Sequence, residues 1–202
     1  MPRVAHIPVS FVVEGDIDEA VVRAIAGQLG VDVHEVFVRN GKPAVLKALR
    51  GFNASARSRP WFVLVDLDQD SRCAGEFVAQ QLPEPSTKMR FRVAVRAVES
   101  WLLADHDGFA RFFRVRPGGV SAHPESLPDP KQSVVDAARS SRAAMVRDGV
   151  PPRPGSGRRT GQLYAALLIE YVIQHWDPDA ARKRSASLDR AMTRLSELAA
   201  KC

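Results

Sequence analysis

The segment Trp61-Phe-Val-Leu-Val-Asp66-Leu-Asp68-Gln-Asp70 joins a run of five apolar residues to three carboxylates. An apolar run of this length, preceded by Pro60, predicts a buried strand. Alternate residues of a strand share a face, so Asp66 and Asp68 begin on one side, with Asp70 in the following turn. Clustered carboxylates repel one another unless a cation or hydrogen-bond donors compensate their charge. Mg²⁺ or Mn²⁺, held by carboxylate oxygens and water, would do so. A solvated turn whose Asp caps the next helix is the alternative.

Glu14 is another carboxylate that follows an apolar run, the predicted first strand over residues 8–13. Gly15 allows a tight turn after it, and an amphipathic helix follows. Asp16 and Glu19 match a capping box, with Asp in place of Ser or Thr, so both have a structural explanation. Glu14 has none, and it stands at the carboxyl end of a strand, where α/β sheets place their ligands. We therefore take Glu14 as a candidate site residue.

Two further strands are predicted from β-branched and apolar runs over residues 31–39 and 91–98. Glu99 follows the second run, although a Glu in the first turn of a helix also complements the helix dipole. Strands that alternate with helices predict an α/β, Rossmann-like fold with a mostly parallel sheet of about four strands flanked by helices. A parallel sheet gathers its carboxyl ends on one edge, so we expect Glu14, the Asp66–Asp68 pair and Glu99 to converge there.

The chain changes character after Arg114, where loops and helices replace the strand pattern. We expect an α/β catalytic domain over residues 1–114 and a C-terminal helical extension over residues 115–202 packed on it, with one compact domain as the alternative. Residues 130–148 predict a helix. Residues 151–161 are rich in Pro, Gly and Arg and predict an exposed connection. They lack the Lys-Ser/Thr ending of a phosphate-binding P-loop.

The net charge of +6 arises from residues 139–202, which carry 12 Lys and Arg against 6 Asp and Glu. Residues 36–65 contain no acidic side chain, so a basic segment precedes the Asp cluster. Basic surface beside an acidic pocket suits a polyanionic substrate handled through a metal, whereas ordinary solvated helix faces would give the same composition. Under the first interpretation, the side chains expected to contact a nucleic acid backbone are Lys42, Arg57, Arg59, Arg158 and Arg159.

Several protein classes are excluded by length, cysteine content and missing motifs. No apolar run approaches the roughly 18 residues of a membrane span, and the N-terminus lacks a signal-peptide pattern. Two cysteines, Cys73 and Cys202, are too few for a disulfide framework and favour a cytoplasmic location. The five histidines show no metal-ligand spacing, and neither Gly-x-Ser-x-Gly nor Gly-x-Gly-x-x-Gly occurs.

The pair Asp66-x-Asp68 also resembles the start of haloacid-dehalogenase-like phosphatases. That family has the pair after its first strand and Thr or Val two residues after the second Asp. Here the pair follows the third predicted strand, and Asp70 stands at that position. A small-molecule phosphatase or nucleotide hydrolase is therefore the second hypothesis.

The order Val13-Glu-Gly-Asp-Ile-Asp-Glu19, then Val65-Asp-Leu-Asp-Gln-Asp70, resembles the TOPRIM domain of topoisomerases, primases and nucleases related to the OLD (overcoming lysogenization defect) proteins. Its signature is a Glu-Gly after the first strand and an Asp-x-Asp after a later one, which hold Mg²⁺. With Glu99-Ser-Trp-Leu-Leu-Ala-Asp105 and Ser185-Ala-Ser-Leu188, the chain is similar to a bacterial TOPRIM-like family of unassigned function. The resemblance covers essentially the whole chain, with the TOPRIM part over residues 8–105.

The resemblance implies a phosphoryl-transfer enzyme of the nuclease type, acting on DNA or RNA with Mg²⁺ or Mn²⁺, in a bacterial defence context. Glu14, Asp66 and Asp68 would be the catalytic residues, with both Asp side chains on the metal and Glu14 as ligand or general base. Asp70 would lie near the metal, and Glu99 would be a second ligand.

The chain departs from the larger relatives in two ways. Tyr164 and Tyr171 stand in the helical tail, so no tyrosine nucleophile of the topoisomerase kind can be assigned. No ATPase motif occurs, so an ATPase partner would be a separate chain. A third hypothesis is a metal-bearing binding or regulatory module without catalytic turnover.

Overall fold

The computed structural model describes residues 7–200 and divides into two compact units. The first unit contains the residues up to Ala94 and those from Asp189 onward, and the second contains Val95–Leu188. These units divide the chain elsewhere than at the expected boundary after residue 114. The physical reason is that the helices directly after Val95 pack against later helices of the second unit, whereas the last helix belongs mostly with the sheet.

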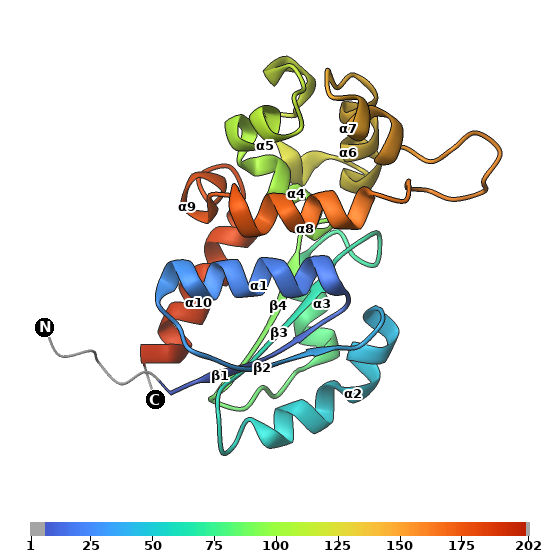
Figure 1. The fold of residues 1–202 in the computed structure, drawn as a ribbon. Helices are drawn as coiled ribbons and strands as arrows, with labels where there is room; N and C mark the ends of the chain where they lie inside the picture. Colours follow the sequence, from blue (N-terminus) through green and yellow to red (C-terminus); the bar gives the residue numbers. More distant parts are fainter. Residues whose placement is uncertain (1–6, 201–202) are drawn as a thin grey trace, which may run out of the picture. The chain divides into compact units, whose positions relative to one another are not determined.

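Four parallel strands form the sheet of the first unit, which confirms the predicted α/β fold. They are β1 (Val9–Val13), β2 (Val33–Val38), β3 (Trp61–Asp66) and β4 (Met89–Ala94), in the order β2-β1-β3-β4 (Figure 1). All residues of β1 and β3 are buried, as expected of central strands covered on both faces. The strand predicted over residues 91–98 ends earlier, at Ala94, because Val98 already begins a helix.

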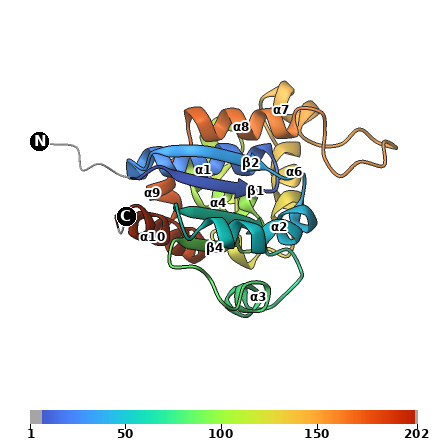
Figure 2. The same cartoon turned by 90° about the horizontal axis from the view of Figure 1, so that it is seen from below.

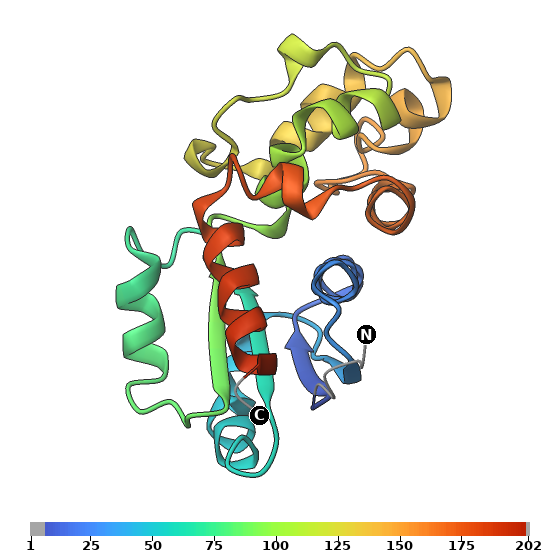
Figure 3. The same cartoon turned by 90° about the vertical axis from the view of Figure 1, so that its left-hand side faces the viewer.

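Helices cover both faces of this sheet. They are α1 (Asp16–Leu29), α2 (Lys42–Ser55), α3 (Ala74–Gln81) and most of α10 (Ala186–Ala200). Helices α1 and α10 lie on one side of the strands and α2 on the other, while α3 runs beside the edge strand β4 (Figures 1, 2 and 3). On the α2 side, Phe52 packs against Trp61 with ring centroids 5.1 Å apart, and Phe37 stacks on Trp61 at 5.5 Å.

The start of α1 differs from the expected capping box. The N-cap is Gly15, not Asp16, and the residue three positions on is Asp18, whose carboxylate accepts a 3.1 Å hydrogen bond from the Gly15 N–H. Glu19 instead pairs with Arg23 at 2.8 Å, one helical turn further on. The capping-box assignment to Asp16 and Glu19 was therefore wrong by one residue, because Gly15 supplies the extended backbone that starts the helix.

The second unit is helical. Its elements are α4 (Val98–Ala104), α5 (His106–Phe112), the 3₁₀ helices η1 (Pro117–Gly119) and η2 (Pro124–Ser126), α6 (Pro130–Arg139), α7 (Ala144–Gly149), α8 (Tyr164–Gln174) and α9 (Pro178–Ala181). The helix predicted over residues 130–148 is divided into α6 and α7. Ser141 lies in the break, where its hydroxyl donates a 2.7 Å bond to the Phe113 carbonyl. None of the helices in residues 7–200 combines the length and apolar character needed to cross a bilayer.

Asp105 joins three segments of the second unit. It caps α5 by accepting a bond from the Gly108 N–H at 3.2 Å. Its other carboxylate oxygen accepts bonds from the Tyr171 hydroxyl at 2.8 Å and from the Asp177 N–H at 3.1 Å. Since Asp105 is buried, these donors replace the water that its oxygens lose on folding.

Candidate active site

The two central strands of the sheet bring Glu14 and Asp66 to one edge. The chain leaves β1 for β2 on one side and returns past β1 to β3 on the other, so β1 and β3 form the point where the strand order reverses. In open α/β sheets, ligands bind beyond the carboxyl ends of the strands at this switch point. Glu14 directly follows β1, and Asp66 is the last residue of β3.

Glu14 and Asp66 are in direct contact. The Asp66 backbone N–H donates a 2.7 Å hydrogen bond to Glu14 Oε1, and Asp66 is only 4% exposed. Burial raises the pKa of Glu14, and the negative charges of Asp66 and Asp68 raise it further. The Asp66 hydrogen bond and the positive charge of Lys42 act in the opposite direction without cancelling the effect. Burial and two neighbouring carboxylates therefore both disfavour the ionised form of Glu14.

Lys42 holds the other two carboxylates of the cluster. Its Nζ lies 2.6 Å from Asp68 Oδ2 and 2.7 Å from Asp70 Oδ2, and it donates a 3.3 Å bond to the Leu67 carbonyl. Burial disfavours the charged form of Lys42 and by itself would lower its pKa. The hydrogen bonds to Asp68 and Asp70 outweigh this effect, so the pKa of Lys42 is raised. The ammonium group also lies 5.9 Å from the ring centroid of Phe77.

The backbone before α2 explains how Lys42 reaches this edge. Asn40 and Gly41 both have positive φ, 54° and 108°, so the chain turns sharply after β2. The Gly41 N–H donates a 2.9 Å bond to the Glu14 carbonyl, which fastens this turn to the end of β1. Helix α2 therefore begins at Lys42, next to the strand ends.

Asp68 has an unusual backbone conformation, with φ of 51° in the left-handed region. Asp tolerates this region better than most residues, but at some cost in free energy. The turn continues with a 3.2 Å bond from the Asp70 N–H to the Leu67 carbonyl. This geometry directs both carboxylates to Lys42.

The carboxylates expected to hold a metal are divided at this edge, where Glu14 and Asp66 lie together at the strand ends and Asp68 and Asp70 pair with Lys42. Within residues 7–200, no group of three or more His, Cys, Asp or Glu side chains is arranged to hold a metal ion. Magnesium sites, however, use one or two carboxylates and complete the octahedron with water and substrate phosphate. Burial and the neighbouring carboxylates raise the pKa of Glu14, and a cation nearby would act in the opposite direction. Asp68 and Asp70 already share the ammonium of Lys42.

The other candidate residues have surroundings of their own. Glu99 belongs to the second unit, where it is 2% exposed and accepts a 3.0 Å bond from the Tyr164 hydroxyl. Arg57 and Arg59 precede β3, at the amino end of the sheet, so the strand separates them from Asp66 by roughly 20 Å. Arg59 there contacts His34 at 2.7 Å.

Arg158 and Arg159 also lie in the second unit, in the connection between α7 and α8. Arg159 forms an ion pair with Asp129, whereas Arg158 lines a cavity described below. Lys42, expected on an exposed basic surface, is instead 8% exposed and part of the carboxylate cluster. Its position 28 residues before Asp70 leaves no local sequence signal for this ion pair.

A second basic group in the first unit was not among the candidate residues. Arg92 on β4 is surrounded by like charges from Arg190, Arg194 and Arg90, and burial together with these charges lowers its pKa. Its Nε is buried and has no hydrogen-bond partner among the described residues. The spacing of Arg90 and Arg92 on a strand, and of Arg190 and Arg194 on a helix, was the available signal.

Comparisons with protein-family models, with curated proteins and with solved structures give no match to this chain.

Proposed function

We propose that the protein is a Mg²⁺- or Mn²⁺-dependent phosphoryl-transfer enzyme that cleaves phosphodiester bonds in DNA or RNA. The observation that carries this proposal is the contact between Glu14 and Asp66 at the switch point of the sheet, where burial and neighbouring carboxylates raise the pKa of Glu14. The resemblance of Glu14-Gly15 and Asp66-x-Asp68 to the TOPRIM signature supports the same chemistry.

The residues have distinct roles in this proposal. A bound divalent cation would supply electrophilic stabilisation of the phosphate charge. Asp66 and Glu14 would hold it, and the raised pKa of Glu14 also suits this carboxylate for accepting a proton from the attacking water. Lys42 holds Asp68 and Asp70 through its two ion pairs, and its ammonium would add positive charge beside the phosphate.

The arginine group on β4 and α10 supports a polyanionic substrate. Four guanidinium groups lie near one another, and the buried Nε of Arg92 has no hydrogen-bond partner in residues 7–200. This arrangement favours the binding of phosphate oxygens. We therefore move the proposed backbone contacts of the first unit from Arg57 and Arg59 to Arg90, Arg92, Arg190 and Arg194. The proposal also includes action in the cytoplasm, which the low cysteine content favours. A separate ATPase chain and a role in bacterial defence are included on the basis of the TOPRIM resemblance.

A non-catalytic regulatory module is the second candidate function. The observation that favours it is the double ion pair of Lys42, because a protein cation already occupies the position between Asp68 and Asp70. In such a module, the carboxylates would bind metal without turnover.

Cleavage of labelled single- and double-stranded DNA and RNA with Mg²⁺ or Mn²⁺ distinguishes the two candidates. We expect the wild type to cleave at least one of these substrates and Asp66→Asn to be inactive. Asp32→Asn is the matched control, since Asp32 is an exposed carboxylate of the same unit at the opposite edge of the sheet, and it should retain full activity. Metal binding by a wild type that cleaves none of the four substrates would refute the nuclease and favour the regulatory module.

A further inference from the structure

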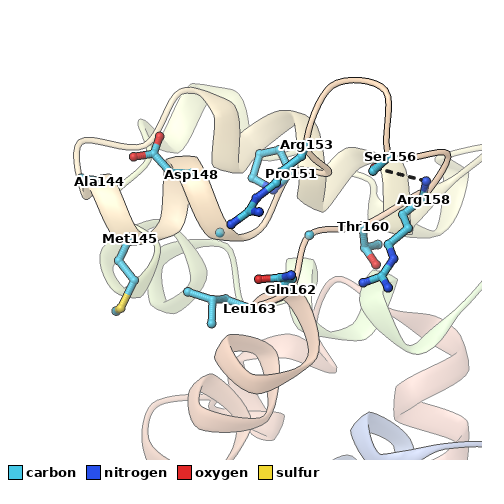
Figure 4. A pocket seen from close by; sticks show the side chains of 12 residues that line it. Ala144, Met145, Asp148, Pro151, Arg153, Ser156, Arg158, Thr160, Gln162 and Leu163 are labelled. Atoms are coloured by element: carbon cyan, nitrogen blue, oxygen red, sulfur yellow. Dashed lines mark hydrogen bonds between the residues drawn. The ribbon is translucent and has the colours of Figure 1, made fainter.

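The second unit contains a cavity that the proposed function does not use. It has a volume of about 600 Å³ and lies between α7 and the start of α8, under the connection that joins them (Figure 4). This volume is typical of sites for small organic molecules. All of its lining residues belong to the second unit.

One wall of the cavity is apolar and open to solvent. Met145 from α7 is 60% exposed, and Leu163, just before α8, is 37% exposed. Pro151 adds a further apolar surface. Large apolar side chains exposed in a hollow favour a ligand with an apolar or aromatic body, because covering them removes apolar area from water.

The lining of the cavity also contains two cationic side chains. Arg153 and Arg158 line the cavity, and Figure 4 shows the guanidinium of Arg153 reaching toward Gln162 and that of Arg158 lying beside Thr160. Within residues 7–200, neither guanidinium takes part in an ion pair, in contrast to the neighbouring Arg159, which pairs with Asp129.

Further polar groups line the same space. The hydroxyls of Ser156 and Thr160 and the amide of Gln162 can donate hydrogen bonds. Asp148 lies away from the arginines in Figure 4 and is 3.5 Å from Arg147, so its carboxylate does not neutralise them. It offers an acceptor for a donor group on the body of the ligand.

The backbone holds the two arginines on facing sides of the connection. Its ends are joined by bonds from the Gly161 N–H to the Val150 carbonyl at 2.8 Å and from the Leu163 N–H to the Gly149 carbonyl at 3.0 Å. A side chain at Gly161 would collide with the carbonyl oxygens of Gly149 and Pro151, so only glycine permits this approach.

The turn between the arginines is also ordered by local bonds. The Ser156 N–H donates to the Arg153 carbonyl at 3.1 Å, and the Arg158 N–H donates to Ser156 Oγ at 3.3 Å. Positive φ values at Gly155 and Gly157, 75° and 67°, allow the reversal. Arg153 and Arg158 are therefore brought to one cavity by a built turn, which reduces the cost of ordering them around a ligand.

We infer that this cavity binds a small organic phosphate, namely a phosphate monoester with an aromatic body of the size of a nucleoside monophosphate. Two guanidinium forks and two hydroxyls match the several oxygens of a phosphate, and they exceed what a carboxylate can accept. Met145 and Leu163 would cover the aromatic body, and Asp148 would accept a bond from its amino group.

The test is calorimetric titration of the full chain with AMP and with phenyl phosphate, which share a phosphate monoester on an aromatic body of different size. Adenosine and inorganic phosphate are the controls that lack one half of the ligand. The variants are Arg153→Ala and Arg158→Ala, with Arg159→Ala as the matched control outside the cavity.

We expect saturable binding of AMP or phenyl phosphate, with both half-ligands bound about tenfold more weakly or worse. Each cavity variant should weaken binding about tenfold, as expected for loss of a charge-assisted hydrogen bond, while Arg159→Ala should bind like the wild type. The inference is overturned if neither monoester binds, or if Arg153→Ala and Arg158→Ala leave the affinity unchanged. Asp66→Asn should bind AMP normally, so failure of the nuclease proposal would leave this result untouched.

Discussion

The backbone N–H of Asp66 donates a 2.7 Å hydrogen bond to Glu14 Oε1, across 52 residues of sequence. This bond links the ends of the two central strands and fixes the Glu14 carboxylate against the backbone of a second acidic residue. The arrangement is unfavourable for the ionised protein by itself, as the raised pKa of Glu14 shows. Sites that are costly to build in this way are often functional.

Replacement of Glu14 by Gln should make the protein more stable near neutral pH. The pKa of Glu14 is raised above its ordinary value of 4.5, so its contribution to stability is present below that pH and is lost as pH rises through the folded pKa. Gln keeps an oxygen that can accept the Asp66 bond but never ionises. Thermal melts between pH 4 and 8 should show a higher Tm and a flatter pH dependence for Glu14→Gln, with cleavage reduced about 100-fold or more. Exposed Glu35→Gln on β2 is the control, and an identical pH profile for Glu14→Gln and wild type would contradict the prediction.

Added Mg²⁺ should stabilise the protein through Glu14 and Asp66. A ligand that binds only the folded state adds about 2.7 kcal/mol when its concentration is about a hundredfold above Kd. We therefore expect Tm to rise with MgCl₂ in the wild type and in Asp32→Asn, but not in Asp66→Asn. NaCl at matched ionic strength separates binding from general screening. Equal responses of all three proteins to Mg²⁺ would exclude a site at Asp66.

Loss of the Lys42 ammonium should destabilise the first unit. In Lys42→Met, Asp68 and Asp70 would face each other without their shared cation, although both side chains are 49% exposed and water would screen part of the repulsion. We expect the free energy of unfolding, measured with urea, to fall by about 1–2 kcal/mol, which lies between the values for surface and buried ion pairs. Lys47→Met, an exposed lysine on the same helix, should change stability by less than about 0.5 kcal/mol.

The hydroxyl of Tyr171 should contribute to the stability of the second unit. Tyr171→Phe removes the donor that lies 2.8 Å from the buried carboxylate of Asp105. Loss of one donor to a buried acceptor lowers the free energy of unfolding by about 1–3 kcal/mol, and chemical denaturation can measure this change. Ile173→Ala on the same helix is the control, because Ile173 is 70% exposed and its truncation should have little effect. A Tyr171→Phe protein as stable as the wild type would show that water replaces the hydroxyl.

Gly161→Ala should disrupt the connection over the cavity. The added methyl group would meet the carbonyl oxygens of Gly149 and Pro151, so the backbone must move apart. We expect the free energy of unfolding to fall by about 1–3 kcal/mol, as it does when a packed site receives extra atoms. AMP binding should be lost as well. Gly118→Ala, which has open space around its added methyl group, should retain both stability and binding.

Short-range pattern was sufficient to predict the sheet and part of the site. The apolar run Trp61–Val65 after Pro60 required a buried strand, and β1 and β3 are buried along their whole length. Since parallel strands end on the same edge, Glu14 and Asp66 could be expected together without a structure. Arg57 and Arg59 could have been placed at the other edge by the same reasoning, because they precede β3.

Long-range packing determined the rest. The ion pairs of Lys42 with Asp68 and Asp70 join residues 26 and 28 apart, and they depend on the turns at Gly41 and Asp68, whose geometry the composition does not specify. The capping position of Gly15 and the membership of α10 in the first unit likewise depend on which surfaces are buried together.

The sequence by itself therefore determined where the strands lie and that they alternate with helices, which predicts a parallel sheet. It also determined the edge on which Glu14 and Asp66 meet, because these features follow from periodicity and chain direction. Only the tertiary structure decided which cation neutralises Asp68 and Asp70, where Glu99 lies, and which arginines remain without an acidic partner. Those outcomes depend on contacts between distant segments, where burial and charge are set by neighbours that no local pattern identifies.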